Sequence, residues 1–193
     1  MKILRSLGSG FFVLVLLGSG CSTVPPYTPG EVPTAAQLEQ MTPEDIHANM
    51  QTMLEKDPPK SLSEDERYQE LMHSINLMKA GRIERFADFQ GMNAFSADGS
   101  AKIVKNDMHY QVVFSEDFSV AAGPRLVVSA SNGLSPSDKK ALEQNGAVRL
   151  GELKASSGIQ TYDLPEGFDI NQTKSIVIFS EPFQTVFAVA NIQ

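Results

Sequence analysis

The chain has 193 residues and a formal net charge of −7, from 16 Lys and Arg against 23 Asp and Glu. This length suits one modest domain with accessory segments, because domains commonly contain about 100–150 residues. The acidic balance argues against nucleic acid as a partner, since phosphates are bound by basic patches. An acidic surface is also repelled by anionic lipid headgroups, so attachment to a membrane would need another device.

The N-terminus has the layout of a secretory signal. Lys2 and Arg5 precede an apolar run over residues 11–17, which is shorter than the roughly 20 residues that span a bilayer. Small residues then lead directly to Cys21. The segment resembles the signal of a bacterial lipoprotein, although Gly18 stands where the usual motif has leucine. Cleavage before Cys21 and acylation of that residue are therefore expected; the alternative is an ordinary export signal with a chance cysteine.

Cys21 is the only cysteine, so the mature chain is expected to contain no intramolecular disulfide and no redox thiol. Several acyl chains on Cys21, palmitate among them, would anchor it stably, whereas one chain is marginal. The proline-rich residues 21–33 predict a semi-extended tether after a signal peptide of residues 1–20. Ser22 after the lipidated residue favours the outer membrane, if the host has one.

Residues 34–82 are predicted to be helical. Thr42, followed by proline and two acids, predicts a helix N-terminus, and two prolines after Asp57 predict its end. Ser63 begins a capping box for a second helix, which Gly81 ends. Both segments carry apolar residues at helical spacing, so the two helices are expected to form a hairpin or to pack on the following domain. Their methionines are interpreted as core residues rather than as metal ligands or a partner groove.

A β domain is predicted over residues 86–193, after a junction at residues 83–90. Residues 101–104 and 108–114 alternate with a period of two and predict a hairpin. Residues 135–144 predict a short surface helix. The fold class is therefore α+β, in which a two-helix segment precedes an all-β sandwich or barrel.

The C-terminal run over residues 174–192 organises this domain. Residues 176–179 are apolar at successive positions, so both faces of that strand must be covered, as in a sandwich or barrel. Other β segments are expected to supply both layers. Pro182 lacks a donor for a β ladder, so the break beside Glu181 is interpreted as a bulge or kink.

Several short motifs together resemble the DM-thirteen domain family over about residues 86–193. They are Phe118, residues 123–126 (GPRL), 150–153 (LGEL), 158–162 (GIQTY), Leu164-Pro165, 175–183 (SIVIFSEPF) and 186–188 (VFA). The resemblance implies an all-β domain of exported and surface proteins, for which electron transfer through a cysteine near the C-terminus has been proposed.

The chain departs from this family pattern at three positions. Phe179 and Ser180 stand where the family has tryptophan and then cysteine, and Arg125 stands where an aspartate is frequent. A hydroxyl cannot cycle through a sulfenic acid or a disulfide, and it is a poor ligand for a soft metal. If the redox activity depends on the thiol, this chain is expected to lack it. Ser180 is interpreted as a small residue tolerated in a core strand, or as a hydroxyl lining a vestigial pocket.

Other candidate groups for chemistry are few. The three histidines have no spacing typical of a metal site, although Met108 and His109 together could contribute to a copper site. The acidic residues 64–66 are explained by helix capping, and Glu116-Asp117 by a turn at a strand end. No nucleophile elbow, phosphate-binding loop or dinucleotide fingerprint is found in the sequence. No catalytic, metal-binding or cofactor-binding residue is assigned, and no cofactor is expected. The histidines are His47, His73 and His109.

Three hypotheses about function follow. The first is a lipid-anchored protein of the cell envelope whose β domain is a binding or interaction module without catalysis, with an envelope protein or a small ligand as its partner. The second is an electron-transfer or metal-handling protein, which would need a bound cofactor. The third is an enzyme, for which a polar cleft with convergent titratable groups would be required.

Overall fold

A computed structural model describes residues 24–107 and 109–192. The predictions of a signal peptide and of lipid on Cys21 lie outside the described residues. The helices are α1 (Ala35–Leu38), α2 (Pro43–Lys56), α3 (Glu64–Ala80) and α4 (Lys139–Gln144). The strands are β1 (Arg82–Gly91), β2 (Ala97–Asp98), β3 (Ser100–Asn106), β4 (His109–Phe114), β5 (Ser119–Val120), β6 (Leu126–Ser131), β7 (Val148–Glu152), β8 (Thr161–Asp163), β9 (Ser175–Ser180) and β10 (Thr185–Asn191).

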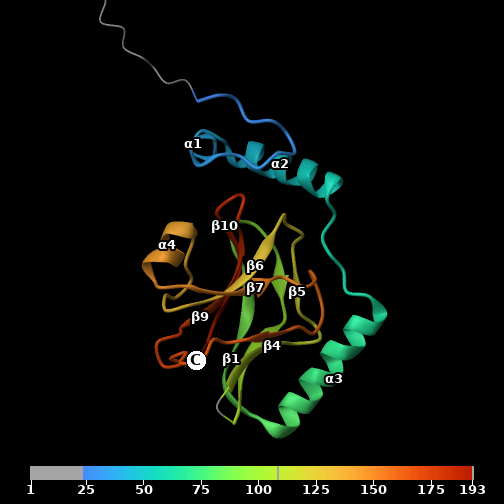
Figure 1. Cartoon of the computed structure of the whole chain (residues 1–193). Helices are drawn as coiled ribbons and strands as arrows, with labels where there is room; N and C mark the ends of the chain where they lie inside the picture. The colour runs from blue at the N-terminus through green and yellow to red at the C-terminus, as the bar shows by residue number, and fades with distance from the viewer. Residues whose placement is uncertain (1–23, 108, 193) are drawn as a thin grey trace, which may run out of the picture.

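Eight strands form one antiparallel sheet in the order β7-β6-β9-β10-β1-β3-β4-β8, curled into a nearly closed barrel (Figure 1). The sheet consists of two four-stranded halves, and the pairing of β1 with β10 joins them. That pairing runs from Phe89 opposite Ala190 to Gly91 opposite Ala188. The α+β class and the barrel-like C-terminal domain predicted from the sequence are therefore confirmed.

The two outer strands of the sheet, β7 and β8, meet at a seam without a β ladder between them. The backbone N–H of Lys154, just after β7, donates to the Tyr162 hydroxyl of β8 at 3.1 Å and to Gln160 Oε1 at 3.0 Å. Glu70 of α3 bridges the same seam, because its carboxylate accepts from the Thr161 N–H at 3.0 Å and from the Lys154 ammonium. Side chains thus replace the missing backbone ladder.

The barrel interior is the main apolar core. Aromatic rings fill its middle, with ring centroids 4.9 Å apart for Phe89 and Phe114 and 4.6 Å apart for Phe114 and Phe118. Alternate residues of β9, Ile176 and Ile178, are fully buried in this core. Such packing follows from the period of two in a strand, which places every second side chain on the same face.

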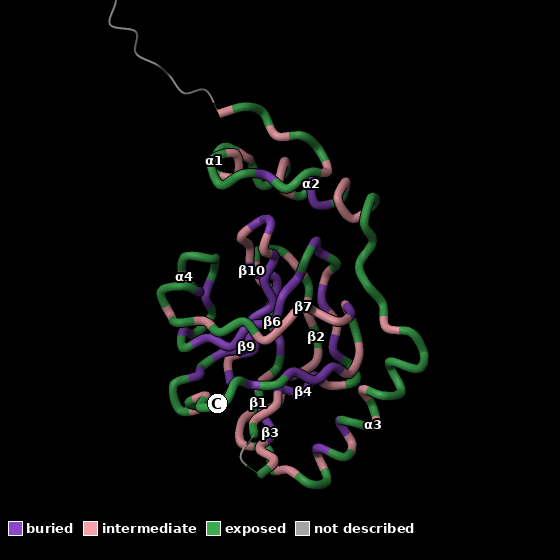
Figure 2. Tube along the Cα trace, viewed as in Figure 1, coloured by how far each residue is buried: buried purple, intermediate pink, exposed green. Residues whose placement is uncertain are grey.

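Two helices cover the outer face of the barrel. Leu142 of α4 packs with Val177 and Phe179, which are the outward residues of β9. Leu77 of α3 packs with Val104 of β3 and with Val113 of β4. The prediction that both faces of residues 176–179 are covered is confirmed, but the outer layer is a helix and not a β segment. Figure 2 shows the resulting contrast between buried strands and exposed outer helix faces.

The C-terminal run is a hairpin, so the predicted bulge or kink at Glu181-Pro182 is wrong. β9 ends at Ser180, and a four-residue turn leads into β10, with Thr185 opposite Ser180. Gln184 in this turn has φ +52°, the left-handed conformation that such a reversal uses. The irregularity in the ladder lies further on, between Val186 and Ala188.

The expected junction at residues 83–90 is a central strand of the sheet. β1 pairs with β3 on one side and β10 on the other, and it begins at Arg82. Its outward positions are open to solvent, with Phe86 61% exposed, and charged residues interrupt the alternation. The alternation of apolar and polar residues is weak in this strand, which explains why the sequence predicted a junction here and the structure has a strand.

The predicted helix starts are confirmed. Thr42 and Ser63 both form capping boxes, with Asp45 and Glu66 as the respective partners. These hydrogen bonds from the cap residues lower the pKa of both carboxyl groups. Both α2 and α3 pack on the β domain. Of the two predicted arrangements, packing on the domain is therefore correct and a helical hairpin is not. None of the helices described by the structure is long and apolar enough to cross a membrane.

Residues 24–56, which we call the cap module, lie over one end of the barrel (Figure 1). Met50 of α2 is 2% exposed and belongs to the barrel core, and Ile46 and Met53 pack against the same cluster. The His47 ring lies 5.2 Å from that of Phe95. Within the described residues, no hydrogen bond or ion pair links residues 24–56 to residues 82–192. Apolar contact alone holds the cap module on the barrel.

Candidate functional site

Ser180, which the sequence predicts at the family's cysteine position, is the last residue of β9 and is completely buried. It has the same parity as Ile176 and Ile178, so it faces the barrel interior near the capped end. Its hydroxyl donates a hydrogen bond of 2.9 Å to the carbonyl of Pro124. The hydroxyl proton therefore helps to hold the loop that precedes β6.

That loop, Gly123-Pro124-Arg125, is tightly constrained. A Cβ at Gly123 would lie 2.5 Å from the Phe187 ring, so only glycine allows this approach. Arg125 has φ +47°, a conformation that is strained for a residue with a side chain. The Arg125 carbonyl accepts from the Glu181 N–H at 3.4 Å. Contacts from Ser180 and Glu181, at the start of the β9–β10 turn, thus hold a strained residue beside the barrel mouth.

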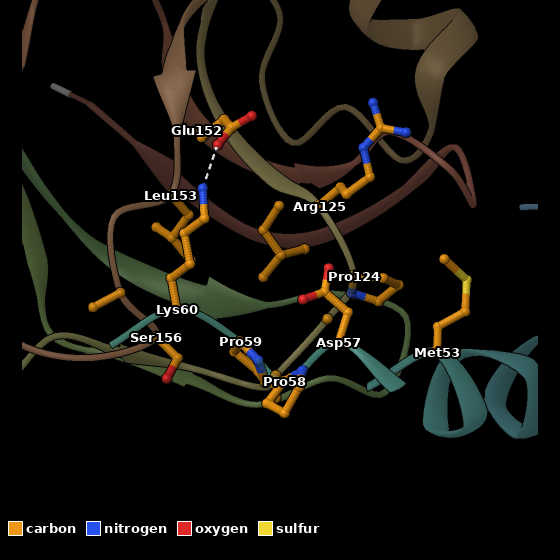
Figure 3. Close-up of a pocket in the computed structure, with 14 residues that line it drawn as sticks. Met53, Asp57, Pro58, Pro59, Lys60, Pro124, Arg125, Glu152, Leu153 and Ser156 are labelled. Atoms are coloured by element: carbon orange, nitrogen blue, oxygen red, sulfur yellow. Dashed lines mark hydrogen bonds and ion pairs between the residues drawn. The ribbon is translucent and has the colours of Figure 1, made fainter. Parts of the chain in front are cut away.

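A cleft of about 200 Å³ opens at this loop, between the barrel mouth, the end of α2 and the linker of residues 57–63 (Figure 3). Its lining is mainly apolar and comes from three separate parts of the chain. The lining residues include Met53, Pro58, Pro59, Pro124, Leu126 and Leu153. At about 200 Å³ the cleft is smaller than the roughly 300–1,000 Å³ of a drug-sized ligand site, so its concave, largely apolar surface would suit only a small molecule.

Charged side chains surround the rim of the cleft. Lys60 of the linker forms an ion pair of 3.2 Å with Glu152 of β7, which closes one side (Figure 3). The hydrogen bond and the positive charge of Lys60 lower the pKa of the Glu152 carboxyl. Arg125 also lines the cleft, and it lies 3.7 Å from Glu181, which is outside the lining and accepts from Arg149 at 3.1 Å. All five groups are well exposed, so these ion pairs contribute little to stability.

The structure does not bring the other sequence candidates together. His47 lies on α2, His73 lies on α3 near Gln111, and His109 is exposed on β4. The acids of residues 64–66 form the first turn of α3, as the capping interpretation predicted. In the part of the chain that the structure describes, no group of three His, Cys, Asp or Glu residues could hold a metal ion.

Sequence reasoning missed a buried polar cluster at the barrel seam. Gln160 is fully buried, and its side chain accepts from the Tyr162 hydroxyl at 2.8 Å and donates to the Ala155 carbonyl at 2.7 Å. Burial raises the pKa of Tyr162. Glu70 completes the cluster from α3. The GIQTY motif contains Gln160, Thr161 and Tyr162, but nothing local in the sequence pairs Thr161 with Glu70, which lies 91 positions earlier.

Comparison with known families identifies the domain. A model described as "Electron transfer DM13" matches residues 88–192. The chain belongs to the DM13 family. This match confirms the resemblance, and it spans the sheet from within β1 to the end of β10. No curated protein and no solved structure was found to match the chain.

The residues of this DM13 domain do not fit thiol-based electron transfer. Residues 88–192 contain no cysteine, and Ser180, which the sequence predicts at the family's cysteine position, directs its proton at a backbone carbonyl. A serine hydroxyl has no accessible redox couple of its own and binds soft metals poorly. DM13 is a family associated with electron transfer and is not a known catalytic family. What the site offers chemically is a shaped cleft with a charged rim.

Proposed function

We propose that this protein is a lipid-anchored component of the cell envelope whose DM13 domain is a binding module. The observation that carries the binding role is the cleft beside Ser180, where the cap module, the linker and the barrel mouth meet. Residues 88–192 contain no cysteine, so the domain has no thiol for electron transfer. A cleft in a domain without a redox side chain of this kind supports recognition in preference to electron transfer.

The anchor is supported by sequence alone. Lys2 and Arg5, the short apolar run and the small residues before Cys21 have the order of a lipoprotein signal. Acyl chains on Cys21 would hold an acidic protein at a membrane that its own surface does not attract. Outer-membrane placement, with Ser22 as the residue after the lipid, is part of the same proposal. Its partner is a small ligand or another envelope protein.

The binding role is tested by native mass spectrometry of the processed protein, extracted gently from membranes. A mass above that of the lipidated chain is expected, and it should be lost in Ser156→Phe, because that side chain lines the cleft. Ser137→Phe is the matched control, since Ser137 is exposed beside α4 and away from the cleft lining. An unliganded wild type, or a mass kept in Ser156→Phe, would argue against a ligand in this cleft.

The second candidate, electron transfer, is favoured by the family to which the domain belongs. It requires a bound group, because Ser180 supplies no redox couple. An absorption spectrum and a metal analysis of protein purified without an affinity metal decide between the two functions. A chromophore or a metal near one per chain would establish the second, whereas a colourless and metal-free preparation supports the binding module.

A further inference from the structure

The proline-rich segment that was expected to be a tether is docked on the cap helices from Pro25 onward. Gln37 donates to the carbonyls of Pro25 and Pro26 at 3.0 and 3.2 Å. Asn49, which is 1% exposed, accepts from the Gly30 N–H at 2.5 Å and donates to the Glu31 carbonyl at 3.1 Å.

Two further bonds secure this segment. Lys56 donates to the Pro29 carbonyl at 3.2 Å, and the Tyr27 hydroxyl donates to Asp45 at 3.4 Å. The segment is therefore part of the cap module, and a buried asparagine satisfies its backbone.

This docking leaves a very short path to the anchor. Only three residues separate Cys21 from Pro25, and an extended chain reaches at most about 3.6 Å per residue, or roughly 14 Å in all. We propose that in the membrane-bound protein the cap module stands directly against the lipid headgroups, with the barrel on its far side. This inference rests on the proposed lipid anchor at Cys21.

The arrangement of the elements indicates which end of the barrel faces away from the membrane. The cap module covers one end of the barrel, and α3 runs from the linker toward the opposite end (Figure 1). A helix of 17 residues is about 25 Å long at 1.5 Å per residue, so the end of α3 lies well beyond the headgroup layer. The cleft, which Met53 of α2 and the linker line, is then at the membrane-proximal end.

Charge identifies the kind of lipid surface that fits. Residues 24–56 contain five carboxylates and one lysine, so the cap module is acidic. Anionic headgroups repel such a surface within a Debye length, whereas a zwitterionic layer does not. The contact is therefore expected with zwitterionic lipid, and the short path to Cys21, not attraction, maintains it.

The test begins with the anchor itself. The processed lipidated chain should float with phosphatidylcholine vesicles, and Cys21→Ala should not. If wild type fails to float, or if Cys21→Ala floats equally well, the lipid anchor of the proposed function is wrong, and this result is separate from the orientation. Because Cys21 is the only cysteine and carries lipid, one added cysteine can be labelled without background.

Orientation is then read by fluorescence quenching. Bimane is placed at Gln51→Cys, exposed on α2, or at Lys79→Cys, exposed near the end of α3, on vesicles with a nitroxide-labelled phosphatidylcholine headgroup. Strong loss of fluorescence is expected at position 51 and none above background at position 79. Equal loss at both positions, or greater loss at position 79, would overturn the orientation.

Two variations check the physical cause. Ten Gly-Ser residues inserted after Thr23 should abolish the difference in quenching, because the longer path no longer restricts the cap module. If the difference in quenching between positions 51 and 79 survives the insertion, the length of chain between Cys21 and the cap module does not set the orientation. Adding anionic lipid at low salt should weaken quenching at position 51. Raising the salt to 0.5 M should restore the quenching, because the Debye length falls to roughly 4–5 Å. If neither anionic lipid nor salt changes the quenching, the proposed preference for zwitterionic lipid is wrong.

Discussion

At the scale of single residues, Ser180 differs by one atom from the cysteine that the sequence predicts at this position in the family. Its hydroxyl is buried and donates to the Pro124 carbonyl, which in turn precedes the strained Arg125. A sulfur atom at the same place would donate only weakly and would be sealed from solvent. Serine at this position therefore holds the loop at the cleft more firmly than a cysteine would and supplies no redox group.

We expect Ser180→Ala to lower the free energy of unfolding by roughly 1–3 kcal/mol, because the buried Pro124 carbonyl loses its donor. Ser180→Cys should lose less and should contain a thiol that reacts slowly with a thiol reagent, since burial keeps it neutral. Urea unfolding and the rate of thiol labelling measure the two effects. Ser157→Ala and Ser157→Cys, at an exposed position, are the controls. Rapid labelling at position 180 would show that the site is open.

At the scale of elements, α3 has a role beyond covering the barrel. Its Glu70 side chain is 16% exposed and bonds to both sides of the seam, at Lys154 after β7 and at Thr161 in β8. The N–H of Thr161 would otherwise be unpaired at a sheet edge. A helix carboxylate thus completes a sheet that its own strands do not close.

Glu70→Ala is expected to lower the free energy of unfolding by about 1–3 kcal/mol, because a partly buried N–H and ammonium lose their acceptor. In a double-mutant cycle with Lys154→Ala, the two costs should be less than additive, since the residues share one interaction. Urea unfolding measures both. Gln69→Ala, an exposed neighbour on α3, should change stability little. Strict additivity would contradict a bridging role.

Patterns carried by adjacent residues were predictable from the sequence. The capping boxes of α2 and α3, the β3–β4 hairpin and the double burial of β9 all follow from local spacing. Features that depend on distant partners were not. The central place of β1 is set by its pairing with β10, and the pair Lys60–Glu152 joins residues 92 positions apart.

The candidate site shows the same division. Ser180 could be singled out because a family motif surrounds it, but its bond to Pro124 and the cleft beside it required the folded chain.

At the scale of the whole molecule, two kinds of attachment hold the helices. α3 is joined to the barrel by hydrogen bonds and an ion pair at the seam as well as by apolar packing. The cap module, by contrast, touches the barrel through apolar side chains around Met50. Contacts of this kind are lost together when the module separates, so it is the part of the protein most able to open on its own.

Hydrogen exchange should therefore show α2 opening at a lower free energy than β9 and β10. Met50→Ala should weaken the docking by about 2–5 kcal/mol, because it removes a buried side chain from the core. Faster exchange is expected in α2 with little change in the β9–β10 hairpin. Met72→Ala, outside the apolar clusters, is the matched control. Equal acceleration throughout the chain would show that cap module and barrel unfold as one unit.

The joining of the two half-sheets has a consequence for how the protein comes to be folded. The ladder between β1 and β10 closes a loop of roughly a hundred residues, from Phe89 to Ala190. Loops of this length close slowly, and pairings of this separation form late in folding. The two half-sheets therefore stay separate until the segment that forms β10 has been synthesised, and the barrel closes only when that strand joins β1.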